Sequence, residues 1–325
     1  MVKEYDSFLH VGFGKCASSF LETRYFTEAN GFHNLYRLEK WRKFLDCQLL
    51  TSQSTYYSPV VPEIDTAKFN PGTIVGMSNG GFLGGIDYRM VLERWKMIMP
   101  TAKVLIVIRN QPEQIYSGYG QRIISGYFHK PDEHIRELIY NAQQDIWGQL
   151  FYDRVYEVTK EFYEDVLMIP VERMREFDVF LSELNSFFGV KIDIENVRVR
   201  ESLNYWSIRL MRFFNQFVRH GVGLPQMSVL PSYEGGIDRF LFNRVPGKEP
   251  SNVRRRMINK LSTSIGQRLP KSDRAKVKFM EKYGPLFEEW FSESNNRLNA
   301  KLDVDLHQYG YVGVTPGSRR PDSFA

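Results

Sequence analysis

The segment from Lys103 to Arg109 constrains the fold of this 325-residue chain more than any other. It reads Lys-Val-Leu-Ile-Val-Ile-Arg, an apolar, β-branched run without the polar alternation of a half-exposed strand. Such a run is typical of a strand that is buried on both faces of a parallel sheet. The run stops before Asn110-Gln-Pro112, and the pattern from Glu113 to Ile124 predicts a helix. We therefore expect Arg109 at the carboxyl edge of the sheet, where open α/β sheets bind ligands.

Strand and helix patterns alternate along the first 200 residues, which predicts the α/β class with a central parallel sheet flanked by helices. The expected strands are Phe8–Val11, Thr73–Met77, Val104–Ile108 and Val166–Ile169. The expected helices are Ser19–Asn30, Asp87–Met99, Pro112–Ser125, Pro131–Asp145, Tyr152–Phe162 and Phe177–Phe188.

From Leu203 onward the pattern becomes mainly helical. The expected helices there are Tyr205–His220, Asn252–Ile265 and Ser272–Asn299, with a Gly/Pro-rich loop region from Gly221 to Pro250. We predict an α/β core over residues 1–202, a helical part packed on the same domain over 203–314, and a flexible tail over 315–325.

A glycine turn follows the first expected strand, and it reads Gly12-Phe-Gly-Lys-Cys-Ala-Ser-Ser19. Backbone amides at the junction of a strand and a helix form an anion site, and a lysine with two hydroxyls favours a phosphate or sulfate ester. The turn lacks the G-x-x-x-x-G-K-[ST] pattern of nucleotide triphosphatases, but Gly12, Gly14 and Ala17 fit a permissive dinucleotide-binding fingerprint. That fingerprint also needs a second strand with an acidic end, and the region from Gly31 to Leu45 looks polar and helix-like instead. As an alternative to any binding site, the turn is only a tight connection between the strand and the helix.

The turn and the Arg109 segment together resemble the sulfotransferases that use 3′-phosphoadenosine 5′-phosphosulfate (PAPS), including bacterial members with a P-loop nucleotide-kinase-like fold. In that family a lysine-bearing loop holds the 5′-phosphosulfate, and a strand ending in R-N-P-x-x-x-x-x-S-x-Y holds the 3′-phosphate. This chain reads Arg109-Asn-Gln-Pro-Glu-Gln-Ile-Tyr-Ser117-Gly-Tyr119, with one residue inserted before the proline and the same spacing from arginine to serine. The resemblance implies a 5′ site at Gly14, Lys15, Cys16, Ala17, Ser18 and Ser19, and a 3′-phosphate site at Arg109 and Ser117.

Weaker similarity to the family extends along the chain. Leu167–Glu172 resembles a strand that ends in a proline and an acidic residue, and Ser294–Leu298 and Asp305–Tyr311 resemble the C-terminal ending of bacterial members. The family takes a further contact to the 3′-phosphate from a late basic loop, for which Arg244 and Lys248 are the candidates here.

The resemblance implies in-line sulfuryl transfer, with PAPS leaving as the 3′,5′-bisphosphate (PAP) and no metal required. Lys15 is the candidate for stabilising charge on the departing phosphate oxygen. Glu39 and His129 are the candidates for the general base, whereas Gly80 stands where bacterial relatives often carry a glutamate. A cysteine thiolate at position 16, with its pKa lowered beside Lys15, is an alternative nucleophile.

Charge and composition bound the partners. The net charge of +5 suits an anionic cofactor but does not by itself indicate nucleic acid. The two cysteines, Cys16 and Cys47, form no disulfide framework, and neither an apolar signal segment nor a membrane-spanning run is present, so we expect a cytoplasmic location. The predicted acceptor is a hydroxyl or amine of a carbohydrate or small molecule, and the oligomeric state is not predicted.

Two other functions stay open at this point. One is a Rossmann-type NAD(P) oxidoreductase that uses Gly12, Gly14 and Ala17, and the other is a non-catalytic binder of anionic polymers that keeps the fold without turnover.

Overall fold

The structure is a computed structural model that describes residues 6–45, 49, 60–64, 69–79, 87–142, 150–196, 204–216, 250–270 and 272–316. The chain forms two compact units, each assembled from separate segments. The first comprises Met1–Gln114, Ile146–Arg200 and Leu286–Ala325, and the second comprises Ile115–Asp145 and Glu201–Pro285. Both units are discontinuous in sequence. The domain bounds expected from the sequence, with a division after residue 202, stay a prediction.

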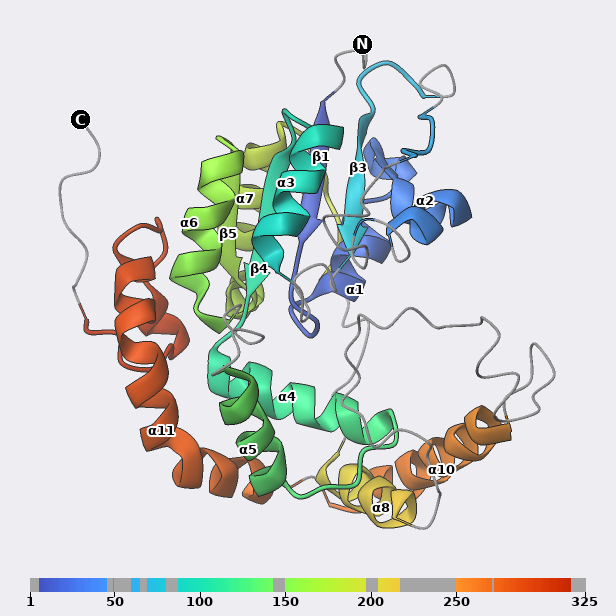
Figure 1. Ribbon diagram of the computed structural model, residues 1–325, viewed down its shortest axis with the longest axis vertical. Helices are drawn as coiled ribbons and strands as arrows, with labels where there is room; N and C mark the ends of the chain where they lie inside the picture. Colours follow the sequence, from blue (N-terminus) through green and yellow to red (C-terminus); the bar gives the residue numbers. More distant parts are fainter. Residues whose placement is uncertain are drawn as a thin grey trace. The chain divides into compact units, whose positions relative to one another are not determined.

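A five-stranded parallel sheet forms the centre of the first unit, and its strands are ordered β2-β3-β1-β4-β5 (Figure 1). The strands are β1 (Ser7–Val11), β2 (Phe32–Asn34), β3 (Ile74–Asn79), β4 (Lys103–Ile108) and β5 (Val166–Pro170). The predicted α/β class with a parallel sheet is confirmed, and all four expected strands are present. Residues Val104 to Ile108 are all buried, as the unbroken apolar run predicted.

The expectation of a purely helix-like region from Gly31 to Leu45 is wrong at Phe32–Asn34, which form the edge strand β2. Three residues are too short to show a strand period in the sequence. These three residues join the sheet because of tertiary contacts. Phe32 packs against Phe8 with ring centroids 5.3 Å apart, and the Asn34 side chain accepts hydrogen bonds from the amides of Tyr36 and Ser78.

Helices surround the sheet, and α3 crosses in front of it in Figure 1. The α-helices that lie entirely in the first unit are α1 (Ser18–Phe20), α2 (Glu39–Phe44), α3 (Tyr88–Ile98), α6 (Tyr152–Phe162) and α7 (Phe177–Phe188). Its short 3-10 helices are η2 (Glu28–Asn30), η3 (Leu35–Arg37), η8 (Val171–Glu176) and η9 (Leu306–Tyr309). Helices α6 and α7 have the predicted bounds, and Asp87 caps α3 by accepting a hydrogen bond from the Met90 amide.

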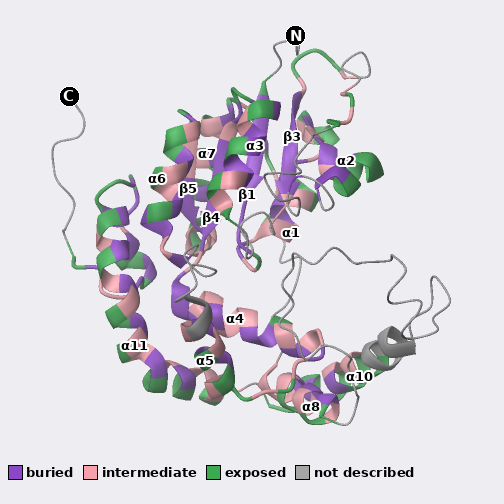
Figure 2. Ribbon diagram, in the orientation of Figure 1, coloured by how far each residue is buried: buried purple, intermediate pink, exposed green. Residues whose placement is uncertain are grey.

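The expected helix Ser19–Asn30 is instead broken into three pieces: α1, the π-helix η1 (Leu21–Tyr25) and η2. The wider turn ends with the Phe26 amide donating to the Leu21 carbonyl at 2.7 Å. Phe26 stacks on Phe8 with a centroid distance of 4.5 Å, and Phe188 of α7 meets Phe26 edge-on at 5.6 Å. This aromatic cluster lies in the core, and Figure 2 shows the strands as buried.

The second unit is helical in its described residues. It contains most of α4 (Gln111–Ile124), α5 (Pro131–Ala142), α8 (Tyr205–Asn215), α10 (Pro250–Gln267) and the first part of α11 (Arg274–Asn299). Tyr119, Ile123 and Met211 form a buried cluster, and α8 packs closely on α10. A Cβ atom on Gly266 would lie 2.1 Å from the Ser207 hydroxyl, so this contact requires glycine. The loop predicted between Gly221 and Pro250 lies outside the described residues apart from Pro250 itself, and so does most of the tail.

Candidate functional site

The loop between β1 and α1 has an unusual backbone. Lys15 and Ala17 have φ angles of 73° and 55°, and they are the only non-glycine residues with positive φ in the described part of the chain. Such a conformation costs about 1–3 kcal/mol for a residue with a Cβ atom, and it is concentrated at ligand and active sites. Left-handed residues interleaved with right-handed ones turn successive amides into an anion-binding concavity. The loop therefore has the backbone geometry of an oxyanion site.

Two side chains, one from the residue after β4 and one from the first turn of α4, hold two carbonyl groups of this loop. The Arg109 guanidinium donates to the Lys15 carbonyl at 3.3 Å, and the Gln114 amide donates to the Gly14 carbonyl at 2.5 Å. The Cys16 thiol in turn donates to the Gln114 side-chain oxygen at 3.5 Å. A trans peptide points its N–H opposite its C=O, so the Lys15 amide faces away from Gln114. The next amide, that of Cys16, donates to the Phe13 carbonyl at 3.3 Å within the loop.

Arg109 follows β4 directly, as predicted, and the structure brings it to the Lys15 loop. Its second terminal nitrogen pairs with Glu113 at 3.1 Å, and its side chain is 25% exposed. The Tyr152 hydroxyl donates to the Arg109 carbonyl at 2.8 Å and so fixes the backbone. A guanidinium carries five N–H donors, which is more than these two side-chain contacts use. Arg109 can therefore bind an oxyanion without releasing the loop.

The alternative of a Cys16 thiolate nucleophile is wrong. Cys16 is fully buried, and burial raises the pKa of its thiol, with the nearby Glu172 carboxylate adding to the effect against the opposing charge of Arg109. The thiol is protonated at neutral pH and serves as a hydrogen-bond donor within the loop. The sequence shows that Lys15 is next to Cys16, but the burial of the thiol depends on tertiary packing and has no local signal.

The two base candidates lie in different units. Glu39 begins α2 on the surface and pairs with Lys43 at 2.8 Å, and this ion pair lowers the pKa of its carboxyl group. A lowered pKa weakens a general base. His129 belongs to the second unit, where its ring stacks on Tyr127 and Phe128 with centroid distances of 4.7 and 4.5 Å. The assignment of either residue as the base stays a prediction.

The other predicted ligands are spread along the chain. Ser18 and Ser19 open α1 and are partly exposed, and the Ser19 carbonyl accepts a hydrogen bond from the Thr23 hydroxyl at 2.6 Å. Ser117 is partly exposed in the section of α4 that belongs to the second unit. Arg244 and Lys248 lie outside the described residues.

Glu172 is a site neighbour that sequence reasoning passed over, although the weak similarity of Leu167–Glu172 pointed to it. It follows β5, and its carboxylate accepts hydrogen bonds from the Asn110 amide at 3.1 Å and the Tyr311 hydroxyl at 3.4 Å. Burial raises the pKa of this carboxyl group, while the hydrogen bonds and the charge of Arg109 oppose the rise. Glu172 thus stabilises the turn between β4 and α4 by accepting the backbone amide of Asn110.

His10 lies in β1 just before the loop and is fully buried. Its Nδ1 atom lies 2.7 Å from the Ser78 hydroxyl, and burial lowers its pKa to about 3. An unfolded histidine takes up a proton near pH 6.5, whereas the folded one stays neutral until much lower pH. The neutral side chain therefore stabilises the fold above pH 6.5, and this contribution is lost as the pH falls.

We expect the free energy of unfolding to depend on pH through His10. Between pH 6.5 and 5, this residue should contribute a decrease that approaches about 1.4 kcal/mol per pH unit. A His10→Asn variant should lose that part of the slope in urea unfolding curves measured across the window. Equal slopes for the variant and the wild type would show that His10 takes up its proton in the folded state.

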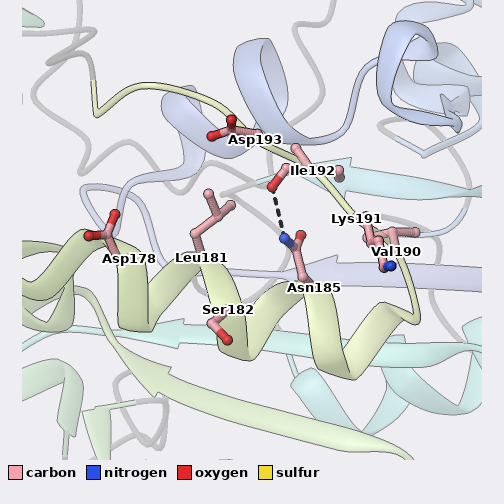
Figure 3. A pocket seen from close by; sticks show the side chains of 8 residues that line it. All are labelled: Asp178, Leu181, Ser182, Asn185, Val190, Lys191, Ile192 and Asp193. Atoms are coloured by element: carbon pink, nitrogen blue, oxygen red, sulfur yellow. Dashed lines mark hydrogen bonds between the residues drawn. The ribbon is translucent and has the colours of Figure 1, made fainter.

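Two surface grooves lie away from the loop. One, of about 370 Å³, is lined by α7 and the segment after it, where the Asn185 amide donates to the Ile192 carbonyl at 2.8 Å (Figure 3). The other, of about 510 Å³, lies beside α6 and Lys301. Neither groove includes Lys15 or Arg109. Within the described ranges, no group of three or more His, Cys, Asp or Glu residues could hold a metal ion, and no helix is long and apolar enough to cross a membrane.

Comparison with known proteins finds similarity among solved structures but none among family models or curated sequences. No protein-family model matches the chain, and no curated protein sequence matches it. Among solved structures, the chain is similar to a sulfotransferase from Alicyclobacillus acidocaldarius, with 19% sequence identity and a TM-score of 0.45. The similarity covers 66% of this chain and 93% of that one. The α/β assignment rests on the chain's own parallel sheet.

Proposed function

We propose that this protein is a PAPS-dependent sulfotransferase that moves a sulfuryl group to a hydroxyl or amine of a carbohydrate or small-molecule acceptor. The observation that carries the proposal is the hydrogen bond from the Arg109 guanidinium to the Lys15 carbonyl. It joins two segments that are 94 residues apart, and both resemble phosphate-binding motifs of that family. A donor with phosphate groups at both ends needs two such cationic segments at one sheet edge.

The loop residues fit the 5′ end of the donor. The left-handed backbone at Lys15 and Ala17 supplies amides for an oxyanion, and the partly exposed lysine adds a charge. PAPS would supply the sulfuryl group, and charge would accumulate on the phosphate oxygen that it leaves behind. The Lys15 ammonium would stabilise that charge, and the Arg109 guanidinium would hold the second phosphate. Cytoplasmic location and the absence of a required metal remain parts of this proposal.

The sheet argues against the NAD(P) alternative. Dinucleotide-binding folds place their second strand beside the first, in the order 3-2-1-4-5-6. Here β3 lies beside β1, and β2 lies outside it. The second strand does exist, but it ends in Asn34, whose buried amide oxygen accepts backbone hydrogen bonds. The residue that ends β2 is therefore an asparagine and not the acidic residue that binds the ribose in dinucleotide-binding folds.

Transfer of ³⁵S from labelled PAPS to a panel of sugars, amines and phenols tests the proposal. The expected result is acceptor-dependent labelling by the wild type and almost none by a Lys15→Ala variant. Tight PAP binding without transfer to any acceptor would favour the non-catalytic binder. NADPH binding without PAP binding would favour the oxidoreductase and overturn the proposal.

A further inference from the structure

The C-terminal segment of the first unit reaches the turn that carries Arg109. We infer that Asn295 of α11 is a positioning residue for the anion loop, because it fixes Gln111 and thereby the donors that flank Gln111. The effect on ligand affinity rests on the proposed function, whereas the effect on the loop does not. Asn295 itself touches no residue of the loop in the hydrogen bonds described for it.

Gln111 and Asn295 form a reciprocal amide pair in the interior. The Gln111 nitrogen donates to the Asn295 oxygen at 2.6 Å, and the Asn295 nitrogen donates back at 3.2 Å. Both residues are fully buried. Each side chain has one more tie, from Gln111 to the Leu150 carbonyl at 3.4 Å and from Asn295 to the Val312 carbonyl at 3.0 Å. Because neither side-chain amide can reach water, its hydrogen bonds are satisfied only when the two amides face each other in this orientation. The pair therefore fixes the position of Gln111, the first residue of α4.

A second tie holds the neighbouring residue. The Asn110 side chain donates to the Gly310 carbonyl, and its backbone amide donates to Glu172. The Tyr311 hydroxyl donates to the same carboxylate. Gln111 is thus held by α11, and Asn110 is held by the segment that follows this helix.

The turn between β4 and α4 carries both side chains that donate hydrogen bonds to the Lys15 loop. Arg109 immediately precedes Asn110, and Gln114 lies one helical turn beyond Gln111. These two side chains bind the carbonyl groups of Lys15 and Gly14. A shift of the turn would move both donors together and release the loop from its strained backbone conformation. Gln111 stands where the pattern that Arg109–Tyr119 resembles has its proline, so the difference at this position supplies the anchor.

The test compares two buried asparagines of α11. Asn295→Leu removes the pair with Gln111. Asn299→Leu is the matched control, since Asn299 is also a buried asparagine of α11 and its side chain accepts a hydrogen bond from the Leu306 amide at 2.7 Å. Gln111→Met/Asn295→Leu replaces the pair by apolar side chains of similar shape and leaves neither amide unpaired, so it should fold even if Asn295→Leu does not. The readouts are hydrogen exchange in a peptide covering residues 12–20 and calorimetric titration with PAP.

We expect exchange in residues 12–20 to accelerate about tenfold in the Asn295 variants, because the loop opens locally more often. PAP affinity should fall by about tenfold to a hundredfold, the range for a misplaced binding group. Asn299→Leu should lower the melting temperature and change neither readout. Equal effects of the Asn299 and Asn295 variants, or an unchanged loop in folded Asn295 variants, would overturn the inference. If the wild type does not bind PAP, the proposed function fails, and the exchange data still decide whether Asn295 positions the loop.

Discussion

Replacing Lys15 by alanine is expected to lower the rate of sulfuryl transfer by about 10²–10³-fold and to weaken PAP binding much less. The reason is that charge grows on the departing phosphate oxygen during transfer, so an ammonium group there acts more strongly on the transition state than on the bound donor. The alanine keeps a Cβ atom at a position with a φ of 73°, so the substitution does not relieve the strained backbone. Steady-state transfer rates over a range of PAPS concentrations, with PAP affinities from calorimetry, measure the two effects.

Two further variants at this position separate charge from conformation. Lys15→Met keeps the length of the side chain without its charge and should behave like Lys15→Ala. Lys15→Gly relieves the left-handed backbone and should lose the charge effect all the same. An equal loss in turnover and in PAP binding for Lys15→Ala would mean that the lysine holds the nucleotide and does not act on the transition state.

Replacing Arg109 by alanine is expected to weaken PAP binding by about 1.5–3 kcal/mol, the range for a hydrogen bond to a charged group. Arg109 also supports the Lys15 carbonyl, so part of the loss could come through the loop. Titration with adenosine 5′-phosphate, which lacks the 3′-phosphate, separates the two contributions. A direct contact predicts that the variant loses affinity for PAP and little for adenosine 5′-phosphate.

Arg89→Ala is a matched control for the Arg109 variant. Arg89 lies in α3, is half exposed and pairs with Glu161 at 2.6 Å, so its removal takes away the same net charge elsewhere in the first unit. PAP affinity should be unchanged in this variant. A similar loss for Arg89→Ala and Arg109→Ala would assign the effect to net charge and remove Arg109 from the site.

The sequence predicts the parts of this fold that local pattern decides. The unbroken apolar run of β4 and the amphipathic periods of α6 and α7 have clear signals, and the structure contains all three. The edge strand β2 and the π-helix η1 have none, because each depends on aromatic packing with Phe8 from another part of the chain. The discontinuous units also follow from long-range contacts that a linear division cannot express.

The site divides in the same way. Arg109 could be expected near the Lys15 loop because the carboxyl ends of parallel strands meet at one edge, and β4 is the direct neighbour of β1. Gln114, Glu172 and Asn295 join the loop and its turn through contacts across 62 to 184 residues, for which no local pattern exists. The general base is harder still to predict. The sequence does not show which side chains pair with Glu39 and His129, and these partners help to decide whether either residue can accept a proton.

Calorimetric titration of the wild-type protein with PAP, and with adenosine 5′-phosphate for comparison, tests the central claim most directly. The claim is that the Lys15 loop and Arg109 bind both phosphate groups of one nucleotide. It predicts a single site for PAP and binding of adenosine 5′-phosphate that is weaker by about tenfold or more, the value of one charge-assisted contact. Equal affinities for the two nucleotides, or no binding of PAP, would contradict the claim.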